Sequence, residues 1–376
     1  MRQKKIVMFM PYINVQAARN VEDVLYKRDD CGRLWIGEGP QVKAFEKALK
    51  ARFGFRHCVA LNSGTAGLEL ALALAGVGPG DEVITPAQTC TATNMPILRA
   101  RARCVFADIQ YQTGNIDWMD INHRVTEHTK AIMVVHWAGY PCDMKEITFL
   151  AQRLGIPVIQ DGAHSLGATY EGQPIGVTSE YYMCSFQAIK QLTTGDGGML
   201  ALLDEDKYDE ARRRRWFGID RDNRTLRLDG YAHWDQAEVG YKMHMNDIAA
   251  AIGLGNLEDI DWILNRRAEI AERYRAELAQ APGVQLFDSR ADRTSANWLF
   301  TMHVKNRTGF CLMMRAAEIE VSVVHIRNDV HSVFGGRRSD LPVTDLYERT
   351  NISIPLHQGM TDDDVGRVIQ AIQGGW

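Results

Sequence analysis

Lys190 lies in the segment SFQAIKQLTTGDGG, residues 185–198, where its amine could do chemistry. The apolar run YYMCSF leads into this segment, and Thr, Asp and Gly residues typical of a tight turn follow the lysine. An amine held at the end of a buried strand loses hydration, so its pKa falls and it becomes a nucleophile toward carbonyl groups. The alternative is an ordinary surface lysine at a strand end.

A second predicted strand end carries the small residues NSGTA, residues 62–66. Gly64 allows a ligand to approach the backbone closely, and the N–H groups of the helix turn that follows suit a phosphate. Small residues at strand–helix turns are common, so this motif by itself is more often structural.

A third predicted strand end is VIQDGAHS, residues 158–165, where Asp161 closes a buried strand. An unpaired buried carboxylate is expensive, so Asp161 either caps a helix or holds a positively charged ring nitrogen of a cofactor. His164 is near enough in sequence to stack on or hydrogen-bond to the same ligand, although a single histidine there is more often structural.

Taken together, a phosphate cradle, a buried aspartate and a desolvated lysine are what pyridoxal phosphate (PLP) requires. The lysine forms an imine, the aspartate keeps the pyridine nitrogen protonated, and the ring accepts electrons from a substrate carbanion. The order of these three features along one α/β chain favours a PLP site over three unrelated structural features.

The elements that would position these residues change character along the chain. From about residue 40 to 205, strand-like and helix-like segments alternate, which predicts a mostly parallel sheet covered by helices, with ligands at the carboxyl ends of its strands. Residues 245–283 form one long helical pattern. Predicted strands at 283–287, 297–304, 321–326 and 351–357, and helices at 310–319 and 361–375, then indicate a smaller α/β domain.

Composition argues against several classes of protein. The net charge of −4 does not favour nucleic acid as a partner, and the run RRRR at 212–215 follows acidic residues, as in a solvated helix face. Seven dispersed cysteines without a CxxC pair indicate reduced thiols and no zinc site. No apolar run is long enough to span a bilayer, so we expect a cytoplasmic protein without a membrane partner.

Longer stretches resemble a known family. In order they are GEGPQVKAFEKAL, ALNSGTAGLELAL, GVGPGDEVITPAQTCTAT, VHWAGYPCDM, VIQDGAHSLGATYEG, SFQAIKQLTTGDGGML, GYKMHMNDIAAAIGLGNL and SIPLHQGMTDDDV. They are similar to the DegT/DnrJ/EryC1/StrS family of sugar aminotransferases, which are fold-type I PLP-dependent enzymes. The resemblance implies a large PLP-binding domain over residues 1–245, including an N-terminal arm and a mostly parallel seven-stranded sheet. Residues 246–376 would form a connecting helix and a small C-terminal α/β domain.

The same resemblance implies roles for the residues that match the family's motifs. Lys190 would be the Schiff-base lysine and the base that moves the substrate proton. Asp161 would pair with the pyridine nitrogen and His164 with the ring hydroxyl, where many members have Gln. The residues expected at the phosphate are Gly64, Thr65, Ala66 and Ser185.

Lys242, in GYKMHM, occupies the position that reaches the phosphate of the neighbouring subunit's cofactor, which is usually Asn. The resemblance therefore implies a homodimer with shared active sites. The chain departs from the family at Cys90, where a bulky aromatic usually stacks on the cofactor ring, and at Met243 and His244, where Tyr-Arg is common. Either the ring packs more loosely or another side chain covers it, and Cys90 is kept as a cofactor contact.

The resemblance places three residues near the substrate, namely Trp35, His325 and Arg327. Arg327 is either a diphosphate ligand or an ordinary surface charge. Family members mostly transfer an amino group from L-glutamate to a keto group of a nucleotide-linked deoxy-sugar by a ping-pong mechanism, with the pyridoxamine form of the cofactor appearing during turnover. The open alternatives are a cyclitol aminotransferase, a PLP-dependent sugar dehydratase and a non-catalytic regulator on the same fold.

Overall fold

The computed structural model describes residues 4–220, 225–226, 228–230, 232–236 and 238–376. Its main feature is a seven-stranded sheet in the order β1-β9-β8-β5-β4-β2-β3. Only β9 runs against its neighbours, which confirms the mostly parallel sheet predicted from the sequence. The strands are β1 (His57–Leu61), β2 (Glu82–Pro86), β3 (Arg103–Ala107), β4 (Thr129–Val135), β5 (Val158–Asp161), β8 (Tyr181–Ser185) and β9 (Gly198–Leu202).

Helices cover both faces of this sheet, because side chains alternate between the faces along each strand. Cys58 and Ala60 of β1 point into one core, and Val59 and Leu61 point into another. The first core also receives residues from α2 (Pro40–Phe53), α5 (Trp118–Arg124), α6 (Met144–Leu154) and α8 (Asp247–Leu257). The second receives residues from α3 (Gly64–Leu74), α4 (Thr91–Arg99) and α7 (Glu205–Arg214).

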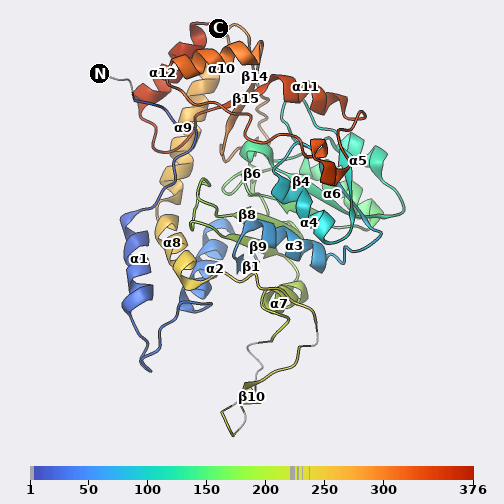
Figure 1. The fold of residues 1–376 in the computed structure, drawn as a ribbon, viewed down its shortest axis with the longest axis vertical. Coiled ribbons are helices and arrows are strands. Elements are labelled where there is room, and N and C mark those ends of the chain that lie inside the picture. The colour runs from blue at the N-terminus through green and yellow to red at the C-terminus, as the bar shows by residue number, and fades with distance from the viewer. Residues whose placement is uncertain (1–3, 221–224, 227, 231, 237) are drawn as a thin grey trace.

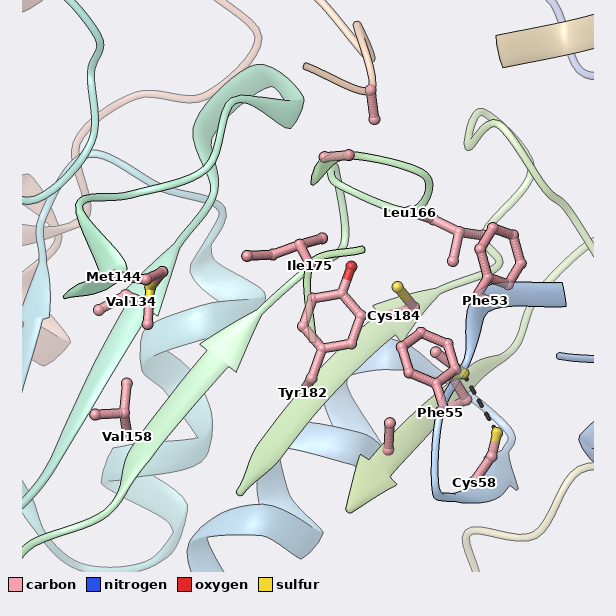
Figure 2. Close-up of a cluster of buried hydrophobic side chains, with 14 of the residues drawn as sticks. Phe53, Phe55, Cys58, Val134, Met144, Val158, Leu166, Ile175, Tyr182 and Cys184 are labelled. Carbon is pink, nitrogen blue, oxygen red and sulfur yellow. Dashed lines mark hydrogen bonds between the residues drawn. The ribbon is translucent and has the colours of Figure 1, made fainter. Parts of the chain in front are cut away.

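Figure 2 shows part of the first core around Tyr182 of β8. The Phe55 ring lies 5.7 Å from the Tyr182 ring, centroid to centroid. Both side chains are buried, as is Cys184 further along the same strand. Close packing at this end of β8 fixes the strand that leads directly to Lys190.

A third core lies in the C-terminal part of the chain. It is built on the antiparallel strands β12 (Val284–Leu286), β14 (Phe300–Val304) and β15 (Asn351–Ile354). The helices α9 (Ile260–Leu278), α10 (Arg307–Ala316) and α12 (Asp362–Gln373) contribute buried residues to it. Near the chain start, the Ile6 N–H donates to the Glu318 carbonyl (2.9 Å), so the N-terminal segment also joins this core, beside α12 in Figure 1.

The remaining elements are short or peripheral. Helix α1 (Val15–Tyr26) packs on α8, and Figure 1 shows it at the edge of the molecule. The others are α11 (Pro342–Thr350), the small sheet of β6 (Thr169–Tyr170), β7 (Gln173–Pro174) and β13 (Arg293–Thr294), the hairpin β10 (Thr225–Leu226) and β11 (Ala232–His233), and the 3-10 turns at Trp137–Gly139, Asn328–Val330 and Ser332–Phe334. Within the described ranges, every helix is too short or too polar to span a bilayer, and no three His, Cys, Asp or Glu residues gather as a metal site requires.

Three local predictions are wrong. The helical pattern of residues 245–283 is two helices, because Glu258 and Asp259 tighten into i→i+3 hydrogen bonds between α8 and α9. The strand predicted at 321–326 is reduced to one bridge, Ser322 to Ser353, since Val324 adopts a left-handed φ of 62°. Arg215, expected on a solvated face, is buried and bonded to Glu38 and Glu46.

Candidate active site

The three strand ends singled out in the sequence meet at one edge of the main sheet. Strands β1, β5 and β8 all point the same way, so the turn at Ser63, the carboxylate of Asp161 and the loop after Ser185 lie at their carboxyl ends. Lys190 stands in this loop, with its backbone N–H donating to the Gln187 carbonyl (2.9 Å). The fold therefore brings together the residues that the sequence pattern only suggested.

Helix α3 begins at this edge with amides that no helical carbonyl can satisfy. The Ser63 hydroxyl accepts from the Ala66 N–H (3.1 Å), which leaves the Gly64 and Thr65 N–H groups at the mouth of the helix. A Cβ at Gly64 would stand 3.0 Å from the Ser185 Cβ, so a larger residue would push β8 away from the start of α3. Main-chain amides, a helix N-terminus and the Ser185 hydroxyl form a cradle that suits a phosphate.

Asp161 is buried, with 4% of its surface exposed. Its carboxylate accepts hydrogen bonds from the Thr93 hydroxyl (2.7 Å) and from the Ala163 N–H (3.0 Å). Burial nevertheless raises the pKa of this carboxyl, although the two hydrogen bonds and the charge of Lys190 act in the other direction. A cationic ring nitrogen beside Asp161 would supply the partner that this carboxylate needs.

His164 is buried above the same strand end, and its ring stacks on the Trp298 ring at a centroid distance of 3.7 Å. Its Nδ1 atom is buried and has no hydrogen-bond partner among the described residues. Burial, followed by the charge of Lys190, lowers the pKa of His164 well below its usual 6.5, so the imidazole is neutral. A neutral ring nitrogen without a partner is suited to a ligand hydroxyl.

The Lys190 amine lies over the face of Trp298, with Nζ 3.6 Å from the ring centroid. Burial lowers the pKa of Lys190 from its usual 10.5 to about 8, against the opposing effect of Asp161. The sequence-based expectation of a lysine with a depressed pKa is thus met by the surroundings of the side chain. Such an amine is a far better nucleophile at neutral pH than a surface lysine.

The segment containing His325 closes another side of the site. The Gln88 side chain donates to the His325 carbonyl (2.9 Å), and the Asn328 side chain donates to the Cys90 carbonyl (3.2 Å). The His325 ring lies 5.8 Å from the His164 ring, and its Nε2 is buried without a partner among the described residues. Burial, then the charge of Lys190, lowers the pKa of His325 to about 4.

Arg327 does not fit either interpretation made from the sequence. It is fully buried, and its guanidinium forms a two-pronged ion pair with Asp329, with both nitrogen–oxygen distances 2.6 Å. Asp345 pairs with a third nitrogen of the same group. Because carboxylates occupy these donors, we correct the assignment of Arg327 from diphosphate ligand or surface charge to a structural role.

Among the described residues, the side chains of Trp35 and Lys242 make no hydrogen bond to, or ring contact with, Lys190, Asp161 or His164. Trp35 is 39% exposed and donates from its indole to Asp29 (3.0 Å). Lys242 is exposed, and its carbonyl accepts from the Asn62 side chain (3.3 Å). Their predicted roles at a shared site are not met within one chain and remain predictions about a dimer.

Thr93 and Trp298 are site residues that sequence reasoning missed. Thr93 lies in the first turn of α4, and its hydroxyl points to Asp161. Trp298 precedes β14, where a tryptophan in an apolar run reads as core. Neither position carries a local signal of function, because each acts only through residues distant in the chain.

The arrangement as a whole fits PLP. The phosphate cradle, the unsatisfied His164 Nδ1 and the buried Asp161 match the phosphate, the ring hydroxyl and the ring nitrogen of the cofactor, and Lys190 provides the amine. This fit rests on the chemistry of the donor set.

Comparison with known proteins gives the same result. The model of the DegT/DnrJ/EryC1/StrS aminotransferase family matches residues 18–373. The chain is 33% identical to the UDP-4-amino-4-deoxy-L-arabinose–oxoglutarate aminotransferase of Shewanella sediminis, covering 96% of each chain. It superposes on AtS13 from Actinomadura melliaura with a TM-score of 0.94, 36% identity and full coverage of both chains.

A third relative bears on the cofactor. Spr1654 from Streptococcus pneumoniae, solved in a PLP form, matches with a TM-score of 0.90 and 28% identity over 99% of this chain and 98% of that one. These matches confirm the fold class, the enzyme class and the resemblance, and they support PLP as the cofactor. The chain belongs to the DegT/DnrJ/EryC1/StrS aminotransferase family.

Proposed function

We propose that the protein transfers an amino group from L-glutamate to a keto group of a nucleotide-linked deoxy-sugar. The observation that carries the proposal is the meeting of Lys190, Asp161 and His164 beside the N-terminus of α3. The Shewanella relative, named for a UDP-sugar and oxoglutarate, supports this choice of substrates. PLP, when bound, supplies an electron-accepting ring that stabilises negative charge at the substrate carbon.

The residues of the chain divide the remaining work among themselves. The amides of Gly64 and Thr65, with Ser185, would hold the cofactor phosphate. Asp161 would pair with the protonated ring nitrogen, and the unpartnered Nδ1 of His164 would hydrogen-bond to the ring hydroxyl. Lys190 provides the amine that carries a proton to and from the substrate carbon, and its pKa of about 8 allows both directions near neutral pH.

His325 is proposed to contact the sugar. Its Nε2 has no partner among the described residues, and its ring lies 5.8 Å from the His164 ring, centroid to centroid. With a pKa of about 4, the imidazole stays neutral and can donate to or accept from a sugar hydroxyl. His325 would then discriminate between sugars by hydrogen bonding to their hydroxyl groups rather than by its charge.

Absorbance of the purified protein with PLP, before and after L-glutamate, tests the proposal. We expect a visible band from the lysine-bound cofactor that disappears when glutamate is added, with release of 2-oxoglutarate. Lys190→Ala should lack the band, and Lys145→Ala, which changes an exposed lysine, should behave as wild type. A band that glutamate leaves unchanged would contradict glutamate as donor, and a band retained in Lys190→Ala would contradict the role of Lys190.

A second half-reaction identifies the acceptor. After treatment with glutamate and removal of excess donor, keto-sugars linked to UDP, dTDP or GDP are added, and return of the visible band is measured. A return with a nucleotide keto-sugar supports the proposal, and a return only with a keto-cyclitol favours the cyclitol alternative. A dehydratase would release water from the sugar without consuming the amino group.

Complementation tests the proposed homodimer with shared sites. If Lys242 reaches the cofactor of the neighbouring subunit, a dimer of one Lys190→Ala and one Lys242→Ala chain has one intact site. Co-expressed in equal amounts, the two variants should then recover about a quarter of wild-type activity, since half the dimers are mixed. No recovery beyond that of the separate variants would show that Lys242 does not act between subunits.

A further inference from the structure

Trp298 contacts both of the side chains proposed to do chemistry at the cofactor. Its ring centroid is 3.6 Å from the Lys190 Nζ and 3.7 Å from the centroid of the His164 ring. Its indole N–H donates to the carbonyl of Ile189 (3.1 Å), the residue before the lysine. Trp298 therefore holds the Lys190 loop by its backbone and the lysine amine by the face of its ring.

Trp298 is itself fixed in place. Only 1% of its surface is exposed, and its backbone N–H donates to the Ala138 carbonyl (2.9 Å). Its carbonyl accepts from the guanidinium of Arg267 (3.4 Å), which is also buried. Phe9 stacks on the indole with a centroid distance of 5.7 Å. A ring held from several sides is a rigid surface for a flexible amine to rest on.

Other groups act on the charge of this amine from a distance: Asp161 and the thiols of Cys90 and Cys184 favour the ammonium, and Arg267 opposes it. None of them fixes the position of the side chain, because the four-carbon stem of a lysine is flexible. An aromatic face attracts an ammonium group, most strongly when the ring is that of tryptophan and the site is dry. The face of Trp298 thus favours the protonated amine and limits where it can move.

We propose that Trp298 is a positioning residue that holds the free ammonium of Lys190 against its ring whenever the amine is not bonded to the cofactor. This rests on the proposed function, because it matters only if Lys190 carries a proton. In that case the indole keeps the proton of Lys190 at a defined place near the substrate. The indole also stacks on His164 and so holds its imidazole in position to meet the hydroxyl of the cofactor.

The test measures protonation of Lys190 directly. Full-length protein is freed of bound PLP with hydroxylamine and desalted. It is then treated with trinitrobenzenesulfonate over a range of pH, and mass spectrometry of the peptide containing Lys190 gives the fraction labelled. The variants are Trp298→Leu, which removes the ring, and Trp298→Phe, which keeps a ring but loses the indole donor. Trp262→Leu is the matched control, since Trp262 is 49% exposed on α9.

Loss of the ring should lower the midpoint of Lys190 labelling by about one pH unit, because the ammonium loses its aromatic partner. Trp298→Phe should show a smaller shift in the same direction, and Trp262→Leu none. An unchanged or raised midpoint in Trp298→Leu overturns the proposal. Where that variant does not fold, the sign of the shift in Trp298→Phe decides.

This result is separable from the proposed function, since labelling of the cofactor-free protein reports on the free amine of Lys190 and needs no reaction with glutamate. A lowered labelling midpoint in a protein that does not react with glutamate would support the positioning role of Trp298 and contradict the proposed transfer from glutamate. A normal reaction with glutamate and an unchanged midpoint would do the reverse.

Discussion

Replacement of Arg327 by methionine should destabilise the protein severely, because it removes one half of a buried ion pair. Arg327 and Asp329 are both fully buried and bind through two nitrogen–oxygen contacts of 2.6 Å. Methionine fills much of the same space but leaves the Asp329 carboxylate buried, with the Arg338 N–H (2.8 Å) as its one remaining donor among the described residues. An uncompensated buried charge of this kind costs about 3–5 kcal/mol.

Two further variants isolate that cost. In Arg327→Met/Asp329→Leu both charges are gone, and most of the lost stability should return, because a well-packed apolar pair replaces a buried ion pair at little cost. Arg338→Met is the matched control in the same segment. Arg338 is about half exposed and pairs with exposed Asp340, so its loss should cost less than about 1 kcal/mol.

Urea unfolding followed by tryptophan fluorescence, at one pH and without added cofactor, measures all three variants against wild type. The structural role of Arg327 predicts that only the single Arg327→Met variant loses stability heavily. A loss below about 1 kcal/mol, together with a raised KM for a nucleotide keto-sugar, would refute this reasoning and restore Arg327 as a substrate ligand.

Three further predictions concern the cofactor site. Gly64→Val should weaken PLP binding about tenfold or more in an absorbance titration, since its Cβ would meet Ser185 at 3.0 Å, whereas Gly78→Val, with open space around it, should bind normally. Asp161→Asn should raise the Kd for PLP at least about tenfold. It should not lower the Tm of the cofactor-free protein, because burial penalises the carboxylate, and a lower Tm would contradict this. The unfolding free energy of the cofactor-free wild type, relative to that of Lys190→Met, should rise as pH rises from about 8 to 10.5. In this range the lysine binds more protons in the unfolded chain than in the folded one. A difference that falls over the same range would contradict the lowered pKa of Lys190.

Much of the fold and part of the site could be predicted because the signals are local. The ends of the apolar runs at Asp161 and before Lys190, and the small residues around Gly64, each depend on a few neighbouring positions. Alternation of strands and helices then places such ends at one edge of a parallel sheet. The family, the mostly parallel sheet and the enzyme class were accordingly within reach of the sequence and are confirmed.

Local signals also misled where the outcome depended on distant residues. The apolar and helical pattern of residues 245–283 continues across Asp259, yet the helix ends there, where Tyr12 and Asn14 donate to the Asp259 carboxylate. The run 321–326 reads as a strand, but its place is taken by a turn at Val324 that brings His325 to the site. Hydrophobic periodicity reports on burial and carries no information about which segment lies opposite.

The sequence by itself therefore determined the types of the reactive groups and the edge of the sheet at which they stand. Only the tertiary structure decided their partners: that Arg327 pairs with Asp329 and Asp345, and that Trp298 lies against a lysine loop 109 residues earlier in the chain. The physical reason is that pairing and burial belong to the packed molecule. A charge or an indole ring has many possible partners in an extended chain, and packing of the whole fold leaves it one.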